Sequence, residues 1–380
     1  HEVPRMTPRQ RLLTALRRGQ PDRVPVTMYE YSHHVADWPS RDPSYAPLLD
    51  LEARYGDTLV WWPHGFPVFF EPRWFRRTQT TGRDGSVTTT TDVDTPRGPL
   101  HAVSRRAPGV MTGWQIEPLV KSDADIDRIL SLPDPAVEFD AAAWRALEQR
   151  VGEAGLLSLN PGDALGHVAG LFDFQDFVLR CCRDDGPVRA LLARAQEHLL
   201  RGMRHCGTVV KDAPVRLWGP EYCGPPLMNP RRFFTRYVVE PDRALTELIH
   251  ATGNFSVIHC HGRLRDLLDH FVEIGADALE PIETLPMPTA DVTLAEVKQR
   301  IGHRLCLMGA VQARTLECGS PDDMRREVQA ALRDAGPGGG FIVLPTSAPF
   351  MTPLTPICLA NARVIYETVH DCGRYPLFLD

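Results

Sequence analysis

The chain has 380 residues and a formal net charge of −6, and 43% of its residues are hydrophobic, which suffices for one large core. The acidic balance argues against nucleic-acid binding, because that function usually needs a basic surface. We expect no membrane span and no secretory signal, since neither pattern is visible. Nine cysteines without regular spacing indicate reduced thiols and a cytoplasmic protein.

Short apolar runs alternate with helix-period segments along most of the chain. The expected strands are 23–26, 58–62, 156–159, 215–218, 255–258, 278–279, 305–308 and 341–344. The expected helices include 8–18, 49–55, 141–154, 172–182, 187–206, 230–252, 294–301, 321–335 and 359–372. This alternation favours a parallel sheet with crossover helices, and eight strands close a barrel. We therefore predict an α/β fold, a single (β/α)8 TIM barrel domain over residues 1–380.

One segment departs from this pattern. Thr-rich alternating runs at 78–81 and 86–91 flank Gly82-Arg83-Asp84-Gly85, which is typical of a β-hairpin. We predict an antiparallel β insertion over residues 74–103.

Polar side chains gather around the fifth expected strand. The run Phe255–Ile258 ends in His259-Cys260-His261-Gly262, and the sixth strand is followed by Glu280 and Glu283. Residues i and i+2 of a strand face the same way, so His259 and His261 project together while Cys260 points away into the core. Polar residues at the carboxyl ends of barrel strands are where chemistry occurs. Two imidazoles beside a carboxylate predict a divalent-metal site.

Several stretches resemble the uroporphyrinogen decarboxylase superfamily. They are 7–26 (TPRQRLLTALRRGQPDRVPV), 95–100 (TPRGPL), 117–134, 219–230, the His-x-Cys-Gly position at 259–262, 304–311 and 338–349. The resemblance covers nearly the whole chain and implies a (β/α)8 barrel with its site at the carboxyl face. True decarboxylases of the superfamily carry an Arg-rich segment after the first strand. Residues 28–38 (MYEYSHHVADW) contain no arginine, which argues against a porphyrinogen substrate.

The resemblance is stronger to the cobamide-linked zinc methyltransferase branch, although the ligands differ. That branch binds zinc through a His, a Cys and a later Cys at the eighth strand. Here His259 matches the first ligand, His261 stands where the family has Cys, and Thr346-Ser347 occupies the last position. In the similar cobalamin-independent methionine synthase, a Glu about twenty residues beyond the His-x-Cys pair also binds zinc. Glu283 lies 22 residues after His261 (283 − 261).

The metal prediction is therefore one zinc ion on His259, His261 and Glu283, with Glu280 as the main competitor for the carboxylate position. Iron or manganese also suits two imidazoles and a carboxylate. Such a site keeps a charge of about +1, whereas a Cys2His site is about neutral, so a substrate with a hard oxygen group becomes more plausible.

Further candidates follow the other expected strands. The catalytic candidates are Glu221, Tyr222 and Asp163, and the substrate-binding candidates are Tyr29, His33, His64, Glu280, Gln312 and Ser347. Each has a structural alternative: Glu221 and Tyr222 could form a turn that packs on the next helix, and Asp163 could only cap a helix.

The favoured function is a metal-dependent methyltransferase that moves a methyl group between a cobamide or corrinoid protein and a small acceptor. One alternative is a metal-assisted lyase or decarboxylase acting on a small carboxylic acid. Another is a non-catalytic, corrinoid-binding barrel. The expected partners are a small-molecule substrate and a corrinoid protein, and a homodimer is left open.

Overall fold

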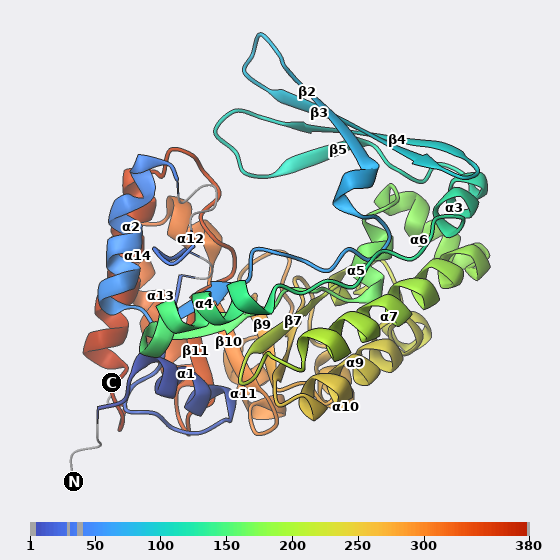
Figure 1. Cartoon of the computed structure of the whole chain (residues 1–380). Coiled ribbons are helices and arrows are strands. Elements are labelled where there is room, and N and C mark those ends of the chain that lie inside the picture. The colour runs from blue at the N-terminus through green and yellow to red at the C-terminus, as the bar shows by residue number, and fades with distance from the viewer. Residues whose placement is uncertain (1–4, 29–30, 36–40, 378–380) are drawn as a thin grey trace.

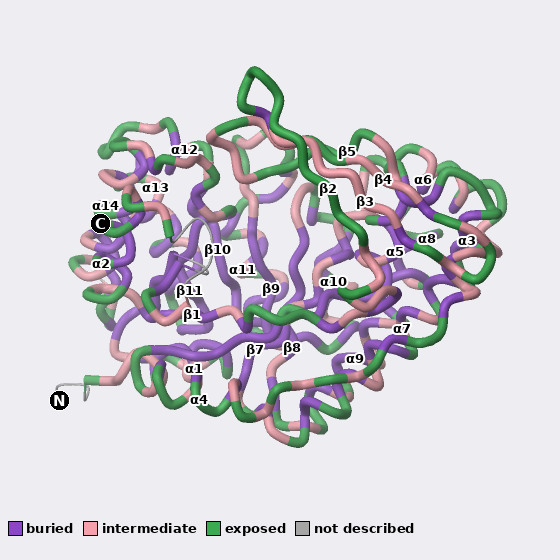
Figure 2. Tube along the Cα trace, turned by 45° about the horizontal axis from the view of Figure 1, so that its top comes forward, coloured by how far each residue is buried: buried purple, intermediate pink, exposed green. Residues whose placement is uncertain are grey.

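In the computed structural model, parallel strands occupy the centre of the molecule and helices surround them (Figure 1). The structure describes residues 5–28, 31–35 and 41–377. The parallel strands are β1 (Thr58–Trp61), β6 (Gly155–Ser158), β7 (Pro214–Trp218), β8 (Phe255–His259), β9 (Ala278–Ile282), β10 (Cys306–Val311) and β11 (Phe341–Pro345). Most of their residues are buried, which explains why they are continuous apolar runs (Figure 2).

The strands form two parallel sheets, one of β1 and β6 and one in the order β11-β10-β9-β8-β7. An isolated parallel bridge from Leu159 to Val215 links the two sheets, and another from Val26 to Val343 joins the 23–26 segment to β11. The Asp57 N–H also donates to the Val26 carbonyl over 2.7 Å. An α/β fold with parallel sheets is thus confirmed, whereas closure into one (β/α)8 barrel stays a prediction.

The first expected strand, at 23–26, is reduced to such isolated contacts. Pro25 has no N–H to donate, so only its carbonyl takes part, as acceptor from the Val343 N–H at 2.9 Å.

Helix α1 (Pro8–Leu16) covers one end of the parallel strands (Figure 1). Thr7 and Gln10 form a capping box at its start, with Pro8 at the first helical position. Its Leu12, Ala15 and Leu16 join a buried cluster with residues of six strands, namely Leu59, Leu156, Val257, Ala278, Cys306, Met308, Ile342 and Leu344. The space between these strands is therefore filled with side chains.

The remaining helices pack outside the strands. They are α2 (Ala46–Tyr55), α3 (Asp123–Leu130), α4 (Ala141–Val151), α5 (Ala164–Ala169), α6 (Phe174–Arg183), α7 (Gly186–Cys206), α8 (Pro230–Phe234), α9 (Glu240–Ala251), α10 (Leu268–Ile274), α11 (Leu294–Ile301), α12 (Ala313–Cys318), α13 (Pro321–Ala335) and α14 (Pro356–Cys372). Among the described residues, no helix combines the length and apolar character needed to cross a bilayer.

The predicted antiparallel insertion is present but longer than expected. Strands β2 (Phe75–Thr81), β3 (Val87–Thr95), β4 (Gly98–Arg106) and β5 (Gly113–Glu117) form a four-stranded sheet in that order. The insertion therefore runs past residue 103 to Glu117, because β5 returns to pair with β4. The sheet stands at the top of the molecule in Figure 1, and nearly all its residues are exposed or intermediate in Figure 2.

Candidate metal centre

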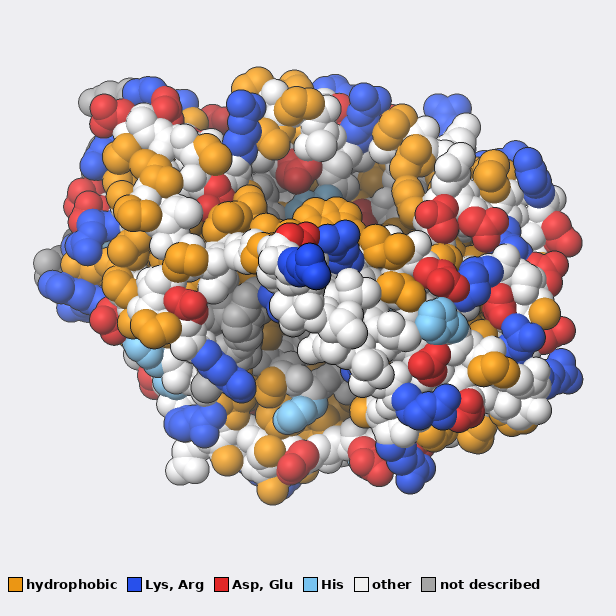
Figure 3. Space-filling model, turned by 90° about the horizontal axis from the view of Figure 1, so that it is seen from above, with side chains coloured by type: hydrophobic (Ala, Val, Ile, Leu, Met, Phe, Trp, Pro, Cys, Tyr) orange, Lys and Arg blue, Asp and Glu red, His pale blue; other side chains and the backbone are white. Residues whose placement is uncertain are grey.

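Three neighbouring strands bring the candidate residues to one place. β7, β8 and β9 run in parallel, with Trp218 opposite His259 and His259 opposite Glu280. Glu221 follows β7 in a short 3-10 turn, η4 (Pro220–Cys223). Seen from above, the surface is hollowed beside the antiparallel sheet, and histidine and acidic side chains are visible in the hollow (Figure 3).

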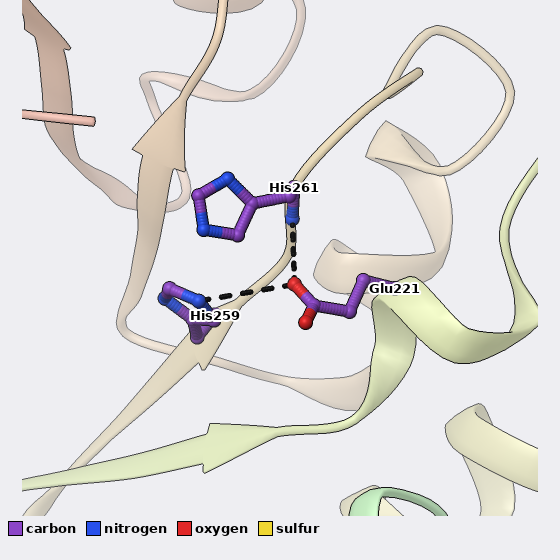
Figure 4. A group of neighbouring side chains, drawn as sticks. All are labelled: Glu221, His259 and His261. Atoms are coloured by element: carbon purple, nitrogen blue, oxygen red, sulfur yellow. Dashed lines mark hydrogen bonds and ion pairs between the residues drawn. The ribbon is translucent and has the colours of Figure 1, made fainter. Parts of the chain in front are cut away.

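Glu221, His259 and His261 each offer one ligand atom, and these atoms all lie within 4.8 Å of one another (Figure 4). The Nε2 atom of His259 lies 3.8 Å from Oε2 of Glu221. The same Oε2 accepts a hydrogen bond from the His261 N–H at 3.2 Å. The rings of His259 and His261 lie 4.7 Å apart at 81°. The pairing of the two histidines, predicted from their spacing, is thus present.

The buried ion pair between Arg216 and Glu280 contacts His259. Nδ1 of His259 lies 3.2 Å from Oε1 of Glu280, and the guanidinium of Arg216 contacts both partners. Burial lowers the pKa of His259, and Arg216 lowers it further, which keeps the imidazole neutral. Burial alone would raise the pKa of Glu280, but Arg216 and His259 outweigh it and lower that pKa to about 2. Glu280 is therefore a carboxylate that orients His259.

Glu283 contacts the second histidine, His261. Its Oε1 lies 3.0 Å from Nδ1 of His261, and its Oε2 accepts from the Gly262 N–H at 3.2 Å and from Thr289 at 2.9 Å. Burial alone would lower the pKa of His261, but the hydrogen bond to Glu283 and the charge of Glu221 raise it. Glu283 is not in the group of three mutually close ligands, so its role as a direct ligand stays a prediction.

The charge of this region suits a divalent cation. Glu221, Glu280 and Glu283 are three carboxylates and Arg216 is one guanidinium, a net charge of −2 when both imidazoles are neutral. Histidine must be neutral to bind a metal, and two imidazoles with a carboxylate form a known zinc donor set. The residues present therefore fit a bound divalent metal ion.

Asp163 caps α5 by accepting from the Gly166 N–H at 2.7 Å. It is fully buried, and its Oδ2 has no hydrogen-bond partner among the described residues. Burial raises the pKa of Asp163 to about 7, and Glu221 adds to the increase. Asp242 of α9 interacts with it, and burial raises the pKa of that carboxyl as well. The helix cap expected as the structural alternative for Asp163 is thus present. Its raised pKa means that this carboxyl exchanges its proton near neutral pH.

The other candidates lie in varied surroundings. Tyr222 is half-buried with its ring 5.9 Å from that of Phe174, and burial raises the pKa of its hydroxyl. Gln312 is buried, and its Nε2 donates to the Ala310 carbonyl at 3.2 Å and to Thr284 at 3.4 Å. The Ser347 hydroxyl donates to the neighbouring Ala348 carbonyl at 3.1 Å.

Two substrate-binding candidates, His33 and His64, have no observed contact with the metal ligands among the described residues. His33 is exposed and forms an ion pair with Asp50 at 3.0 Å. His64 is exposed and packs edge-on against Trp62, with ring centroids 5.1 Å apart. Tyr29 lies outside the described residues.

Sequence reasoning missed Arg216 and did not assign Glu221 to the metal. Arg216 lies inside β7 and also stacks over Trp61, with its guanidinium carbon 4.8 Å from the ring centroid. A charged residue within an otherwise apolar strand is the signal that could have found it, because a buried charge needs a buried partner. The position of Glu221 just after β7, the neighbour of β8, could have placed it beside His259.

Parallel strands with imidazole and carboxylate groups at their carboxyl ends define an α/β protein with a candidate metal centre. Residues 227–372 match the family model described as uroporphyrinogen decarboxylase (URO-D), which confirms the resemblance seen in the sequence. This match includes His259, His261 and Glu283, whereas Glu221 precedes it.

Among solved structures, a methyltransferase from Methanosarcina mazei is similar with a TM-score of 0.61 and 18% sequence identity, covering 96% of this chain and 99% of that chain. At this identity the similarity concerns the fold alone. A GH5-4 broad specificity endoglucanase from Bacteroides salanitronis is 11% identical with a TM-score of 0.40, covering 97% of this chain and 96% of that chain, and supports no argument. None of the curated proteins compared matches the chain.

Proposed function

We propose that this chain is a metal-dependent methyltransferase that moves a methyl group between a cobamide or corrinoid protein and a small acceptor, on a closed (β/α)8 barrel. The observation that carries the proposal is the group of Glu221, His259 and His261, whose ligand atoms lie within 4.8 Å at the ends of neighbouring strands. The similarity in fold to a protein named as a methyltransferase supports it.

In this proposal His259, His261 and one glutamate hold the ion, which is zinc, with iron or manganese as alternatives. Glu221 is favoured as the glutamate by its position, and Glu283 then orients His261 through their 3.0 Å hydrogen bond. A zinc ion bound there would supply a Lewis acid that lowers the pKa of an acceptor group or polarises a carbonyl.

The protein's own groups then manage protons and orientation. Burial and the charge of Glu221 raise the pKa of Asp163 to about 7, so this carboxyl can bind or release a proton near neutral pH. Tyr222 keeps its hydroxyl proton, because burial raises its pKa. Burial and Arg216 lower the pKa of His259 and keep it neutral, and Glu280 orients its ring, as a metal ligand requires.

A metal-assisted lyase or decarboxylase acting on a small carboxylic acid is the second candidate. The donor set favours it, because imidazole and carboxylate leave a more positive ion than thiolates would, and such an ion suits an oxygen-bearing substrate. Cys260 is not one of the three clustered ligands. It is fully buried, and burial raises its thiol pKa well above the usual value, which disfavours the thiolate. A non-catalytic, corrinoid-binding barrel remains the third reading.

The test uses purified protein of known metal content, incubated with methylcobalamin and a panel of thiols while the corrinoid absorbance is followed. We expect wild type to demethylate methylcobalamin and His259→Ala to be inactive. The control His303→Ala changes an exposed histidine outside the group and should behave as wild type does. Absence of demethylation with every acceptor would favour the lyase. Unchanged metal content and activity in His259→Ala would show that His259 holds no catalytic metal, which would contradict the proposed site.

A further inference from the structure

A second cluster of charge surrounds a cavity of about 820 Å³ at the amino end of the parallel strands. The cavity lies between α1, the end of α2 and the end of α14. Its lining includes five arginines, Arg5, Arg11, Arg23, Arg54 and Arg374. Its volume is in the range of small-molecule sites, and its lining is cationic rather than apolar.

The cavity is separate from the candidate metal centre. Arg23 precedes the strand contact at Val26, and Gly56, which also lines the cavity, precedes β1. Glu221 instead follows β7, and His259 ends β8. Residues before parallel strands and residues after them lie at opposite ends of a sheet, so the two regions face away from each other.

Arg11 and Arg23 are held in place by the carboxylates of Asp22 and Asp57, which accept several hydrogen bonds each. Asp57 is completely buried and accepts from Arg11, from Arg23 at 2.7 Å and from the Val26 N–H at 3.0 Å. Asp22 accepts from Arg11 at 2.6 and 2.9 Å and from two main-chain N–H groups, those of Met6 and Arg23. These pairs hold the two guanidinium groups in one geometry against the strand ends.

The exposed arginines at the rim have no such partner. None of the ion pairs within the described part of the chain involves Arg54 or Arg374. Arg54 lies over the ring of Tyr55 at 5.0 Å, and Arg374 is held by a main-chain bridge to Arg23. Counting Asp22 and Asp57 against the five arginines leaves a net charge of +3 around one cavity.

We propose that this cavity binds a small, multiply charged anion that carries phosphate groups. Planar guanidinium groups donate in pairs to phosphate oxygens, and arginine is preferred where such bidentate contacts matter. Arg11 and Arg23 form a rigid cationic floor, because their guanidinium groups already donate to Asp22, Asp57 and main-chain carbonyls. Arg54 and Arg374 supply the donors that contact the anion from the rim. This inference does not rest on the proposed methyl transfer.

The test titrates inorganic pyrophosphate into the full-length protein by calorimetry at constant ionic strength, with citrate as a second arm. We expect saturable binding near one to one, and a loss of affinity of about tenfold or more in the double variant Arg54→Ala/Arg374→Ala. The control Arg77→Ala/Arg231→Ala removes two exposed arginines elsewhere and should bind as wild type does. Preference for pyrophosphate over citrate identifies phosphate as the recognised group.

Two safeguards keep the result interpretable. Metal content is measured before and after each titration, so that extraction of metal by pyrophosphate is not counted as binding. Melting temperatures without ligand establish that both double variants fold, as expected for exposed side chains. Absence of saturable binding, equal affinity in the Arg54/Arg374 variant and wild type, or preference for citrate would each overturn the proposal.

Discussion

The carboxyl end and the amino end of the parallel strands differ in the charge that remains after ion pairing. At the carboxyl end, Arg216 neutralises Glu280, and the carboxylates of Glu221 and Glu283 remain beside two imidazoles. At the amino end, Asp22 and Asp57 hold two arginines, and the remaining cations line a cavity. Both ends contain buried ion pairs. The sign of the charge left unpaired differs between the ends. It favours a cation site at the carboxyl end and an anion site at the amino end.

Of the substitutions considered, removal of the His259 imidazole should have the largest effect, on metal binding at the carboxyl end. His259→Ala takes one of three ligands from the carboxyl end, so we expect stoichiometric metal to be lost and any metal-dependent activity with it. Elemental analysis of the dialysed protein measures the outcome, with His303→Ala as the matched control. Metal retained at one equivalent in His259→Ala would contradict the site.

Breaking the buried pair at the carboxyl end should cost stability. Arg216→Met leaves Glu280 buried without its partner, and we expect the free energy of unfolding to fall by about 3–5 kcal/mol. Urea denaturation measures this change. The double variant Arg216→Met/Glu280→Gln should recover part of the loss, and no difference between single and double variants would show that the pair is not the cause.

The two glutamates near His261 can be ranked by the same metal analysis. Glu221→Ala should weaken metal binding more than Glu283→Gln, for which we expect about a 10- to 100-fold loss, because Glu283 orients a ligand. Metal competition with a chromogenic chelator measures both affinities. The reverse order would restore Glu283 as the direct ligand and exclude Glu221.

A smaller effect concerns Glu52, a carboxyl buried near the amino end. It accepts hydrogen bonds from Tyr366 and from the Met28 N–H at 3.1 Å, yet burial raises its pKa to about 7. A raised acid pKa means that its contribution to stability is complete below the unfolded pKa of about 4.5 and is lost as pH rises through about 7.

Wild type should therefore lose about 1–2 kcal/mol from this residue between pH 6 and pH 8. Glu52→Gln, which cannot titrate, should show a flatter pH dependence over that interval, whatever its absolute stability. Denaturation midpoints across the range measure both slopes. Identical slopes would remove Glu52 as their source.

Sequence patterns found the features that depend on local spacing. The i, i+2 relation placed His259 beside His261 and Cys260 in the core, because alternation along a strand is independent of the rest of the fold. Most strand boundaries were also close, since parallel strands are distinctive apolar runs. However, β9 and β10 each end three residues later than expected, so Glu280 lies inside β9 rather than after it. By contrast, the 23–26 strand was overestimated because Pro25 limits its pairing.

Features that depend on contacts between distant residues could not be obtained in this way. Arg216 meets Glu280 across 64 positions of the chain, and nothing near either residue encodes that contact. Likewise, Arg54 and Arg374 share a cavity only because α2 and α14 end at the same place. Such contacts follow from the order of strands and helices around the sheet, which one sequence does not specify.

The packing of α1 against the strands affects how the two ends of the molecule can influence each other. Leu12, Ala15 and Leu16 are fully or almost fully buried among strand residues, so the interior offers side chains rather than a channel. A molecule released at one end must travel through bulk solvent to reach the other. A packed interior blocks passage but does not by itself couple the two ends. We expect additive binding free energies at the two ends unless one ligand displaces the strands themselves.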